Sequence, residues 1–284
     1  MPNFYIDRDT LKKALSIPTS TTDNNEFLDG TIEAVSRLID EHLGFHVYPA
    51  SGIRYFTAQE TMSLNMEYPL TAVDFVQTSS NASLTFDTTM ATSGYFMTPY
   101  NATEESPKQP WWGVEVNRNN STTVFPKAYQ RATRVQGTWG YYDQRRTSTA
   151  VLSTGVNGTA LTLEITGASS LHPGQTILIG SERMFVSQTP TSATGANTSQ
   201  VTVQRGVNGT SGAAHSSGAA IEIYEYPIID RAALYQSQMD YRAKDAPLGT
   251  AGGDPFGTQH VQAPGGLHPF VIRMLAPIRI PVAR

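Results

Sequence analysis

Two histidines near the amino terminus have the spacing of a metal-binding pair. His42 and His46 are four residues apart, which on a helix would place two imidazoles beside one metal ion. Gly44 lies between them and is expected to end the helix, because glycine readily adopts the left-handed turn that follows a last helical residue. No third ligand is close in sequence, so we predict no metal site and no cofactor.

A catalytic site is the second chemical hypothesis. The chain has no cysteine, which excludes a thiolate nucleophile, a disulfide and a cysteine-ligated metal. It contains no phosphate-binding loop, no dinucleotide fingerprint and no nucleophile elbow. An enzyme would require distant residues such as His172, Glu182 and His215 to converge in a pocket. We predict that the protein is not an enzyme, and the enzyme hypothesis depends on that convergence.

The composition indicates a folded protein with a weakly charged surface. The chain has 284 residues, of which 39% are hydrophobic and 15% charged, and its formal net charge is −4. Charged residues average about 25% in globular proteins, and a tight DNA-binding protein needs clustered Lys and Arg to neutralise phosphates. No segment approaches the ~20 apolar residues that span a bilayer, and no signal peptide is apparent. We expect a soluble protein that is not exported and does not grip DNA.

The amino-terminal region predicts a short helix over residues 9–18 and a long amphipathic helix. In the long helix, apolar residues recur at steps of four and three, which places them on one buried face: Leu28, Ile32, Val35, Ile39 and Leu43. Asp23 and Glu26 predict a capping box at its start, and Gly44 predicts its end. This segment is expected to be a surface helix with marked ends.

Residues 52–142 predict a β-rich region. Alternating, β-branched or aromatic residues, separated by Gly, Pro, Asn and Ser, are typical of strands. We expect strands over residues 53–57, 62–66, 72–77, 112–117 and 131–141, with residues 88–109 mostly in loops.

Residues 147–225 predict a separate all-β module with few charges. Short alternating segments at this spacing favour a small barrel or sandwich; they span residues 160–165, 175–179, 182–186, 200–205 and 220–224. Residues 179–182 predict a hairpin turn. The string Gly-Val-Asn-Gly-Thr occurs at 155–159 and again at 206–210, and Asn-Gly is a strong turn signal. Because the flanking strands differ, convergent turn chemistry is favoured over duplication.

The carboxy-terminal region predicts a third helix, a linker and an extended arm. Pro227 suits a first helical position, and Ile228, Ala232, Tyr235 and Met239 keep helical spacing. Residues 245–267 are rich in Gly and Pro. The last residues are apolar and β-prone, with Pro277 and Pro281 opposing regular pairing. We expect an extended arm that lies on a neighbouring subunit or partner, with folding back on its own domain as the alternative.

Several of these segments resemble the head-tail adaptor family of tailed double-stranded DNA phages. The resemblance covers residues 4–78, residues 131–145 and the closing helix. Its motifs are Leu43-Gly44-Phe45 before Arg54-Tyr55-Phe56, the strand 70–75, and Val-Gln-Gly-Thr-Trp-Gly-Tyr at 135–141. Family members join that last strand almost directly to a Pro-initiated helix, so the module is expected to be an insertion. The resemblance implies an α+β fold: a small helical adaptor core with associated β-strands over residues 1–146 and 226–244, an inserted all-β barrel or sandwich over 147–225, and a linker with an extended arm over 245–284.

The same resemblance implies a structural role in the virion, at the head-tail interface. Family members form a ring, usually of twelve copies, that assembles in the host cytoplasm, binds the portal protein and a downstream neck, stopper or tail protein, and extends the channel for double-stranded DNA without sequence-specific binding. No membrane partner is expected. Portal docking is predicted for Phe270, Val271, Ile272, Arg273, Met274, Leu275, Ile278, Arg279, Ile280 and Arg284. The alternative function is a tail or baseplate module in which residues 147–225 recognise host surface carbohydrate.

Overall fold

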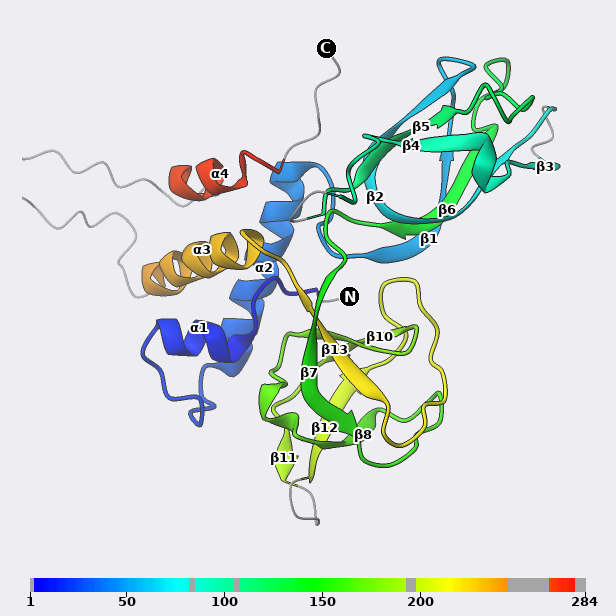
Figure 1. The fold of residues 1–284 in the computed structure, drawn as a ribbon. Helices are drawn as coiled ribbons and strands as arrows, with labels where there is room; N and C mark the ends of the chain where they lie inside the picture. Colours follow the sequence, from blue (N-terminus) through cyan, green and yellow to red (C-terminus); the bar gives the residue numbers. More distant parts are fainter. Residues whose placement is uncertain (1–2, 82–84, 105–107, 193–197, 245–265, 279–284) are drawn as a thin grey trace, which may run out of the picture. The chain divides into compact units, whose positions relative to one another are not determined.

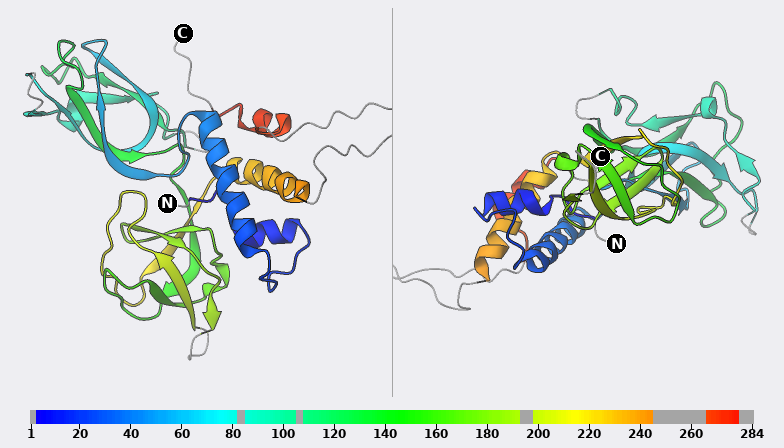
Figure 2. Two further views of the ribbon diagram at one scale, coloured as in Figure 1. Left: turned by 180° about the vertical axis from the view of Figure 1, so that it is seen from behind. Right: turned by 90° about the horizontal axis from the view of Figure 1, so that it is seen from below.

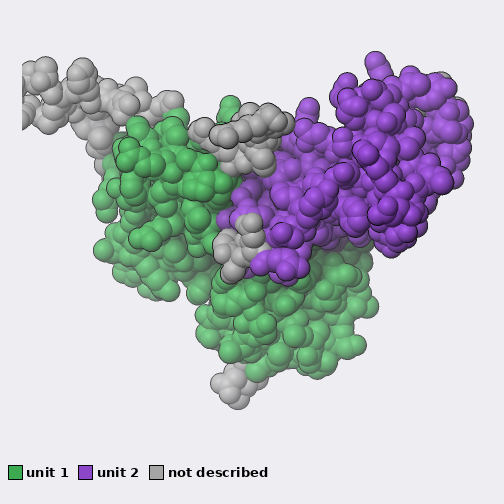
Figure 3. Space-filling view, turned by 45° about the horizontal axis from the view of Figure 1, so that its top comes forward, with its two compact units in different colours: residues 1–44, 145–207, 211–279 green, residues 45–144, 208–210, 280–284 purple. Residues whose placement is uncertain are grey.

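The computed structural model describes residues 3–81, 85–104, 108–192, 198–244 and 266–278 (Figure 1). Within these ranges the chain forms four α-helices and thirteen strands. It divides into two compact units, coloured separately in Figure 3. Unit 1 comprises Met1–Gly44, Arg145–Val207 and Ser211–Arg279, and unit 2 comprises Phe45–Gln144, Asn208–Thr210 and Ile280–Arg284.

The predicted α+β class with a small helical adaptor core is wrong, because the described residues are predominantly β. Two sheets account for most of the regular structure, and one of them closes into a six-stranded barrel. The amphipathic pattern of residues 28–43 is conspicuous in the sequence, whereas the strands are short and interrupted by turns. The helical core was implied by the family resemblance, whereas the larger β content arises from pairing between segments that are far apart in the sequence.

The helices of unit 1 form one packed group. They are α1 (Arg8–Ala14), α2 (Asn25–Leu43), α3 (Ile229–Ala243) and α4 (Pro269–Leu275). Helix α2 contacts α1 and α3, and α3 also contacts α1 and α4 (Figures 1 and 2). The predicted apolar stripe of α2 is confirmed, since all five of its residues are buried. No helix of the described residues has the length and apolar character needed to cross a membrane.

The ends of these helices agree only in part with the predicted signals. Gly44 ends α2 in the left-handed conformation with φ 79°, as predicted. The predicted capping box at the start of α2 is wrong: Asn24 is the N-cap, and it makes no side-chain capping hydrogen bond. A side-chain cap occurs instead on α1, where Asp7 Oδ1 accepts a hydrogen bond from the backbone N–H of Thr10 at 2.8 Å.

The sheet of unit 1 is a closed barrel with one additional strand. Its strands are β7 (Gln144–Leu152), β8 (Thr162–Thr166), β9 (Thr176–Ile179), β10 (Glu182–Val186), β11 (Thr191–Ser192), β12 (Thr198–Gln204) and β13 (Ala220–Glu225). The order is β10-β9-β13-β7-β8-β12-β11, and pairing of β10 with β12 closes the ring of six. Of the two predicted architectures, barrel or sandwich, the structure has the barrel. The predicted hairpin at 179–182 is confirmed, with Gly180 at φ 61° in its turn.

The amino-terminal segment joins the helices of unit 1 to its barrel. The Phe4 ring packs edge-on against Phe185 of β10 at 5.2 Å between centroids. The backbone N–H of Arg8 donates to Pro173 O at 3.0 Å. The predicted division placed residues 1–146 and 226–244 in one adaptor core, separate from the module; in the structure Phe4 and the first residue of α1, Arg8, contact the barrel directly.

Unit 2 contains a six-stranded antiparallel sheet. Its strands are β1 (Ala50–Phe56), β2 (Ser63–Thr78), β3 (Thr88–Thr89), β4 (Tyr95–Thr98), β5 (Trp111–Val116) and β6 (Thr133–Trp139), ordered β1-β6-β2-β5-β4 with β3 on β2. Residues 88–109, predicted as mostly loop, contain β3 and β4. A Cβ on Gly137 would lie 2.1 Å from Ala72 O, so the glycine of the Val-Gln-Gly-Thr-Trp motif permits close contact between β6 and β2.

The predicted extended arm at the carboxy terminus is wrong over residues 269–275, which form α4. Pro269 occupies the first turn, where its missing N–H is harmless, and the His268 side chain accepts from the Phe270 N–H. Helix α4 packs on α3, and Pro277 lies beyond its end. Packing against α3 outweighs the β propensity of this segment. Residues 279–284, and residues 245–265 of the linker predicted over 245–267, lie outside the described residues.

Candidate functional site

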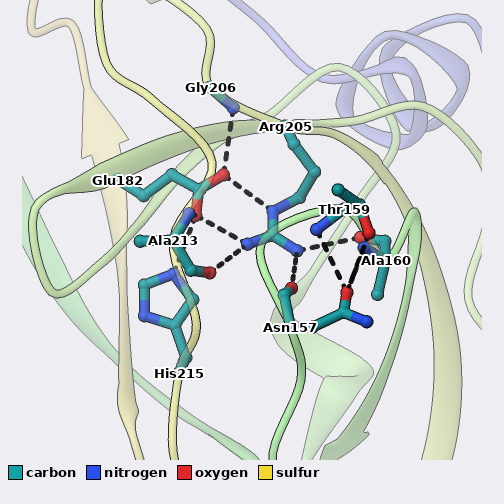
Figure 4. A network of polar contacts seen from close by, with 8 residues as sticks. All are labelled: Asn157, Thr159, Ala160, Glu182, Arg205, Gly206, Ala213 and His215. Atoms are coloured by element: carbon teal, nitrogen blue, oxygen red, sulfur yellow. Dashed lines mark hydrogen bonds and ion pairs between the residues drawn. The ribbon is translucent and has the colours of Figure 1, made fainter.

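A buried ion-pair network connects β10 to the loops at one end of the barrel (Figure 4). The Glu182 side chain is fully buried, and Arg205 binds it through two hydrogen bonds of 2.7 Å. Backbone N–H groups of Gly206 and Ala213 donate to the same carboxylate at 3.0 and 2.9 Å. His215 Nε2 lies 2.8 Å from Glu182 Oε2. Both carboxylate oxygens are therefore occupied by protein donors.

The Arg205 guanidinium is equally committed to the protein. Besides the two bonds to Glu182, it donates to the backbone oxygens of Asn157, Ala160 and Ala213 at 3.0, 2.9 and 2.6 Å. These contacts use all five of its N–H groups. One side chain thus connects strand β10 to two loops, one containing Asn157 and Ala160 and the other containing Ala213.

Competing effects determine the pKa of Glu182. Burial disfavours the carboxylate and raises its pKa, but the hydrogen bonds from Arg205, the backbone N–H of Ala213, His215 and the backbone N–H of Gly206 outweigh burial and lower the pKa to about 2. Glu182 is consequently ionised at neutral pH and remains so in mild acid. Because folding lowers the pKa of Glu182, its ionised form contributes to stability at neutral pH.

The two copies of Gly-Val-Asn-Gly-Thr belong to loops that meet near this network. Val156, in the first copy, exchanges backbone hydrogen bonds with His215 at 2.9 Å. A Cβ on Gly212 would lie 2.3 Å from Gly158 O, so the two backbones are in close contact. Asn157 Oδ1 accepts from the N–H groups of Thr159 and Ala160, which forms the turn. The turn of the first copy therefore contacts Arg205 and the segment that follows the second copy, from Gly212 to His215.

The histidines predicted as chemical candidates lie in separate places. His215 joins Glu182, but His172 Nδ1 pairs with Asp9 Oδ2 of α1 at 2.9 Å. His42 belongs to α2, and His46 stacks on Tyr48 in unit 2. Among the described residues no group of three or more His, Asp or Glu side chains could hold a metal ion. The structure brings Glu182 and His215 together, and it places His172 elsewhere, beside Asp9.

An exposed apolar surface on α3 and α4 is the second candidate. Tyr235 and Met239 are one turn apart on α3, and the Phe270 ring of α4 packs against Tyr235 at 5.0 Å between centroids. These side chains are 43%, 37% and 47% exposed, and we call them the α3–α4 ridge. Helical spacing predicts that four residues of this segment share one face of the helix: Ile228, Ala232, Tyr235 and Met239. Of these four, only Ala232 is buried.

The residues predicted to dock on the portal have different environments. Val271, Leu275 and Ile278 are buried in unit 1, Ile272 and Met274 are partly buried, and Phe270 and Arg273 are exposed. Arg279, Ile280 and Arg284 lie outside the described residues. Portal docking by this segment stays a prediction. Among the predicted docking residues that the structure describes, Phe270 and Arg273 have exposed side chains.

Sequence reasoning missed a groove on α2. The groove measures about 800 Å³ and faces away from the buried stripe; we call it the α2 groove, and its lining residues are Asp23, Glu26, Phe27, Gly30, Thr31, Ala34 and Asp240. Phe27 is 46% exposed and contacts Tyr241 of α3 at 5.8 Å between ring centroids. A large aromatic residue outside the apolar stripe of an amphipathic helix is the signal that would have identified it.

Comparisons of this chain with family models, curated proteins and solved structures gave no match. Its function is therefore inferred from the geometry described above and from the motifs that resemble phage adaptors.

Proposed function

We propose that this protein is a structural subunit of the ring that joins capsid to tail in a tailed phage, below the portal, where it extends the channel for the genome. The proposed assembly is a homo-oligomer, and twelve copies is the number the resemblance implies. Its proposed partners are the portal protein and a neck or tail protein. The proposal that the protein assembles depends on the α3–α4 ridge of unit 1. The proposal that the assembly lies at the head-tail interface of the virion depends on the family resemblance.

The observation that carries the assembly is the α3–α4 ridge. Three large apolar side chains contact one another or lie one helical turn apart, and each is more than one third exposed. Scattered exposed apolar residues are ordinary, but a contiguous group on packed helices is typical of a protein interface. Burying the group against another subunit would remove it from water. This favours an interaction protein that functions as part of a larger assembly.

The barrel of unit 1 has features expected of a rigid structural component. Its interior is apolar and closed, with residues such as Ile177, Met184 and Val201 fully buried. The Glu182–Arg205 network locks the loops at one end through a fully buried carboxylate. A buried polar network whose donors and acceptors are satisfied rigidifies a fold. Such a module suits a particle that must resist the force of a packaged genome.

The charge of the chain agrees with passage of DNA without tight binding. The formal net charge is −4, with 20 basic and 24 acidic residues. A protein that grips DNA gains affinity by neutralising phosphates with clustered basic groups. A weakly acidic ring would let the duplex move through its channel, because it provides few such contacts.

Electron microscopy and sedimentation of the purified protein test the proposed function. We expect rings of uniform size, either from the protein alone or after mixing with the portal protein of the same virus. A protein that remains monomeric in both mixtures would contradict the proposal. Binding of the isolated protein to host cells or glycans, without rings, would instead support the carbohydrate-binding alternative.

A further inference from the structure

The α3–α4 ridge and the α2 groove are two separate surfaces of unit 1, and the charged residues beside them have opposite signs. The α3–α4 ridge is flanked on α3 by Arg231 and Arg242, both exposed and at helical spacing from Tyr235 and Met239. The α2 groove is lined by the carboxylates of Asp23, Glu26 and Asp240 around the exposed ring of Phe27. Among the described residues, the Lys244 ammonium contacts the Phe27 end of the groove. Its Nζ lies 5.4 Å from the centre of the Phe27 ring. One face is therefore apolar with a basic border, and the other apolar with an acidic border.

Gly30 lies on the open side of the α2 groove without a local reason for being glycine. It is inside a 19-residue helix, where glycine costs roughly 1 kcal/mol relative to alanine. A Cβ at this position would meet no atom within 4 Å, and its φ is not in the left-handed range. Neither a turn nor a close contact among the described residues requires it. The missing side chain leaves space above α2 for another element.

We infer that the α3–α4 ridge of one subunit docks into the α2 groove of the next copy, with Arg231 and Arg242 facing the groove carboxylates. This inference rests on the proposed ring and specifies its contact. Because the two faces are different, the contact is heterologous, and repetition of a heterologous contact generates a ring when the rotation closes. The apolar side chains supply the area removed from water, and the opposite charges set the orientation.

The first test uses two complementary variants. Gly30→Leu fills the groove, and Tyr235→Ser with Met239→Ser removes the ridge. Each variant alone is expected to be monomeric under conditions in which the wild-type protein forms rings. Mixed in equal amounts, they should form a dimer and nothing larger, since the unfilled groove of the serine variant still accepts the intact ridge of the Gly30→Leu variant. The matched control Glu33→Leu, on an exposed α2 position outside the groove, should assemble like wild type.

Sedimentation and native mass spectrometry separate the outcomes. Rings formed by Gly30→Leu, or a mixture that gives no dimer, would overturn the inferred pairing while the proposed function stands. A lowered Tm of Gly30→Leu would show that its own chain fills the groove, and would also overturn the pairing. Absence of rings from the wild-type protein, with or without portal, would reject the proposed function itself.

Charge reversal provides a second test of the same contact. Asp23→Lys with Glu26→Lys, and separately Arg231→Glu with Arg242→Glu, should each weaken assembly by roughly tenfold or more, because like charges then oppose each other across the contact. Combining all four substitutions should restore assembly in part. Restoration by the fourfold variant supports the pairing, and additive weakening contradicts it.

Discussion

The Glu182–Arg205 network and the α3–α4 ridge are two regions of unit 1 with opposite relations to solvent. In the network, a carboxylate and a guanidinium are buried and every donor of Arg205 has an acceptor. In the ridge, three large apolar side chains remain between 37% and 47% exposed. The first region is complete within the chain, whereas the second would be stabilised by contact with a partner. The difference supports a stabilising role for the buried pair and, in the proposed assembly, a docking role for the exposed ridge.

The largest expected effect is on the buried pair. Arg205→Ala leaves Glu182 buried without its main partner, which should lower the free energy of unfolding by about 3–5 kcal/mol. Urea denaturation measures this loss. The control is Arg145→Ala, which removes an ion pair to Glu222 with both side chains about one third exposed or more, and is expected to cost about 1 kcal/mol or less. Equal losses in the two variants would show that the network does not stabilise the barrel.

The lowered pKa of Glu182 predicts a specific acid sensitivity. Its pKa is about 2 in the folded protein and about 4.5 when unfolded, so the unfolded state takes up protons first as the pH falls. The stabilisation is complete above about pH 4.5 and disappears as the pH approaches 2, a change of about 3 kcal/mol. Urea denaturation between pH 7 and pH 2 should show Glu182→Gln converging on wild type. A constant difference across this range would contradict the assignment.

The contact between the two Gly-Val-Asn-Gly-Thr loops predicts a smaller effect. In Gly212→Ala the new Cβ would lie 2.3 Å from Gly158 O, so one of the two backbones must shift, at a cost of about 1–3 kcal/mol. Gly155→Ala is the control, because its Cβ would be 3.5 Å from the nearest atom. The Tm of both variants measures the comparison. A Gly212→Ala variant as stable as Gly155→Ala would mean that the loops are not held in contact.

The smallest expected effect has the opposite sign and lies on the surface. Gly30→Ala should raise the stability of the isolated chain by about 0.5–1 kcal/mol, because alanine favours the helix and meets no atom there. Thermal unfolding of the monomer measures the gain. A decrease in Tm would show that the groove beside Gly30 is already occupied within the chain.

Local patterns predicted those elements whose burial follows from spacing along the chain. The stripe from Leu28 to Leu43 and the stop at Gly44 required only helical periodicity and a residue that accepts positive φ. The hairpin between β9 and β10 required only a short turn between alternating strands. Strand β7 was missed because its first half carries Arg145 and Arg146 and is exposed, so it lacks a clear alternating pattern. The helix at 269–275 was missed because its β-prone composition is outweighed by packing on α3.

What the sequence determined by itself is the existence of the long helix, the β-rich segments and the turn chemistry of the two Asn-Gly loops, because these depend on neighbours within a few residues. Only the tertiary structure decided that Glu182 meets Arg205 and His215, which are 23 and 33 residues away, since that contact depends on closure of the barrel through β10 and β12. It also decided that Tyr235 and Met239 face solvent while Ala232 is buried. A helical pattern defines which residues share a face, but the elements that pack against the helix determine which face is covered.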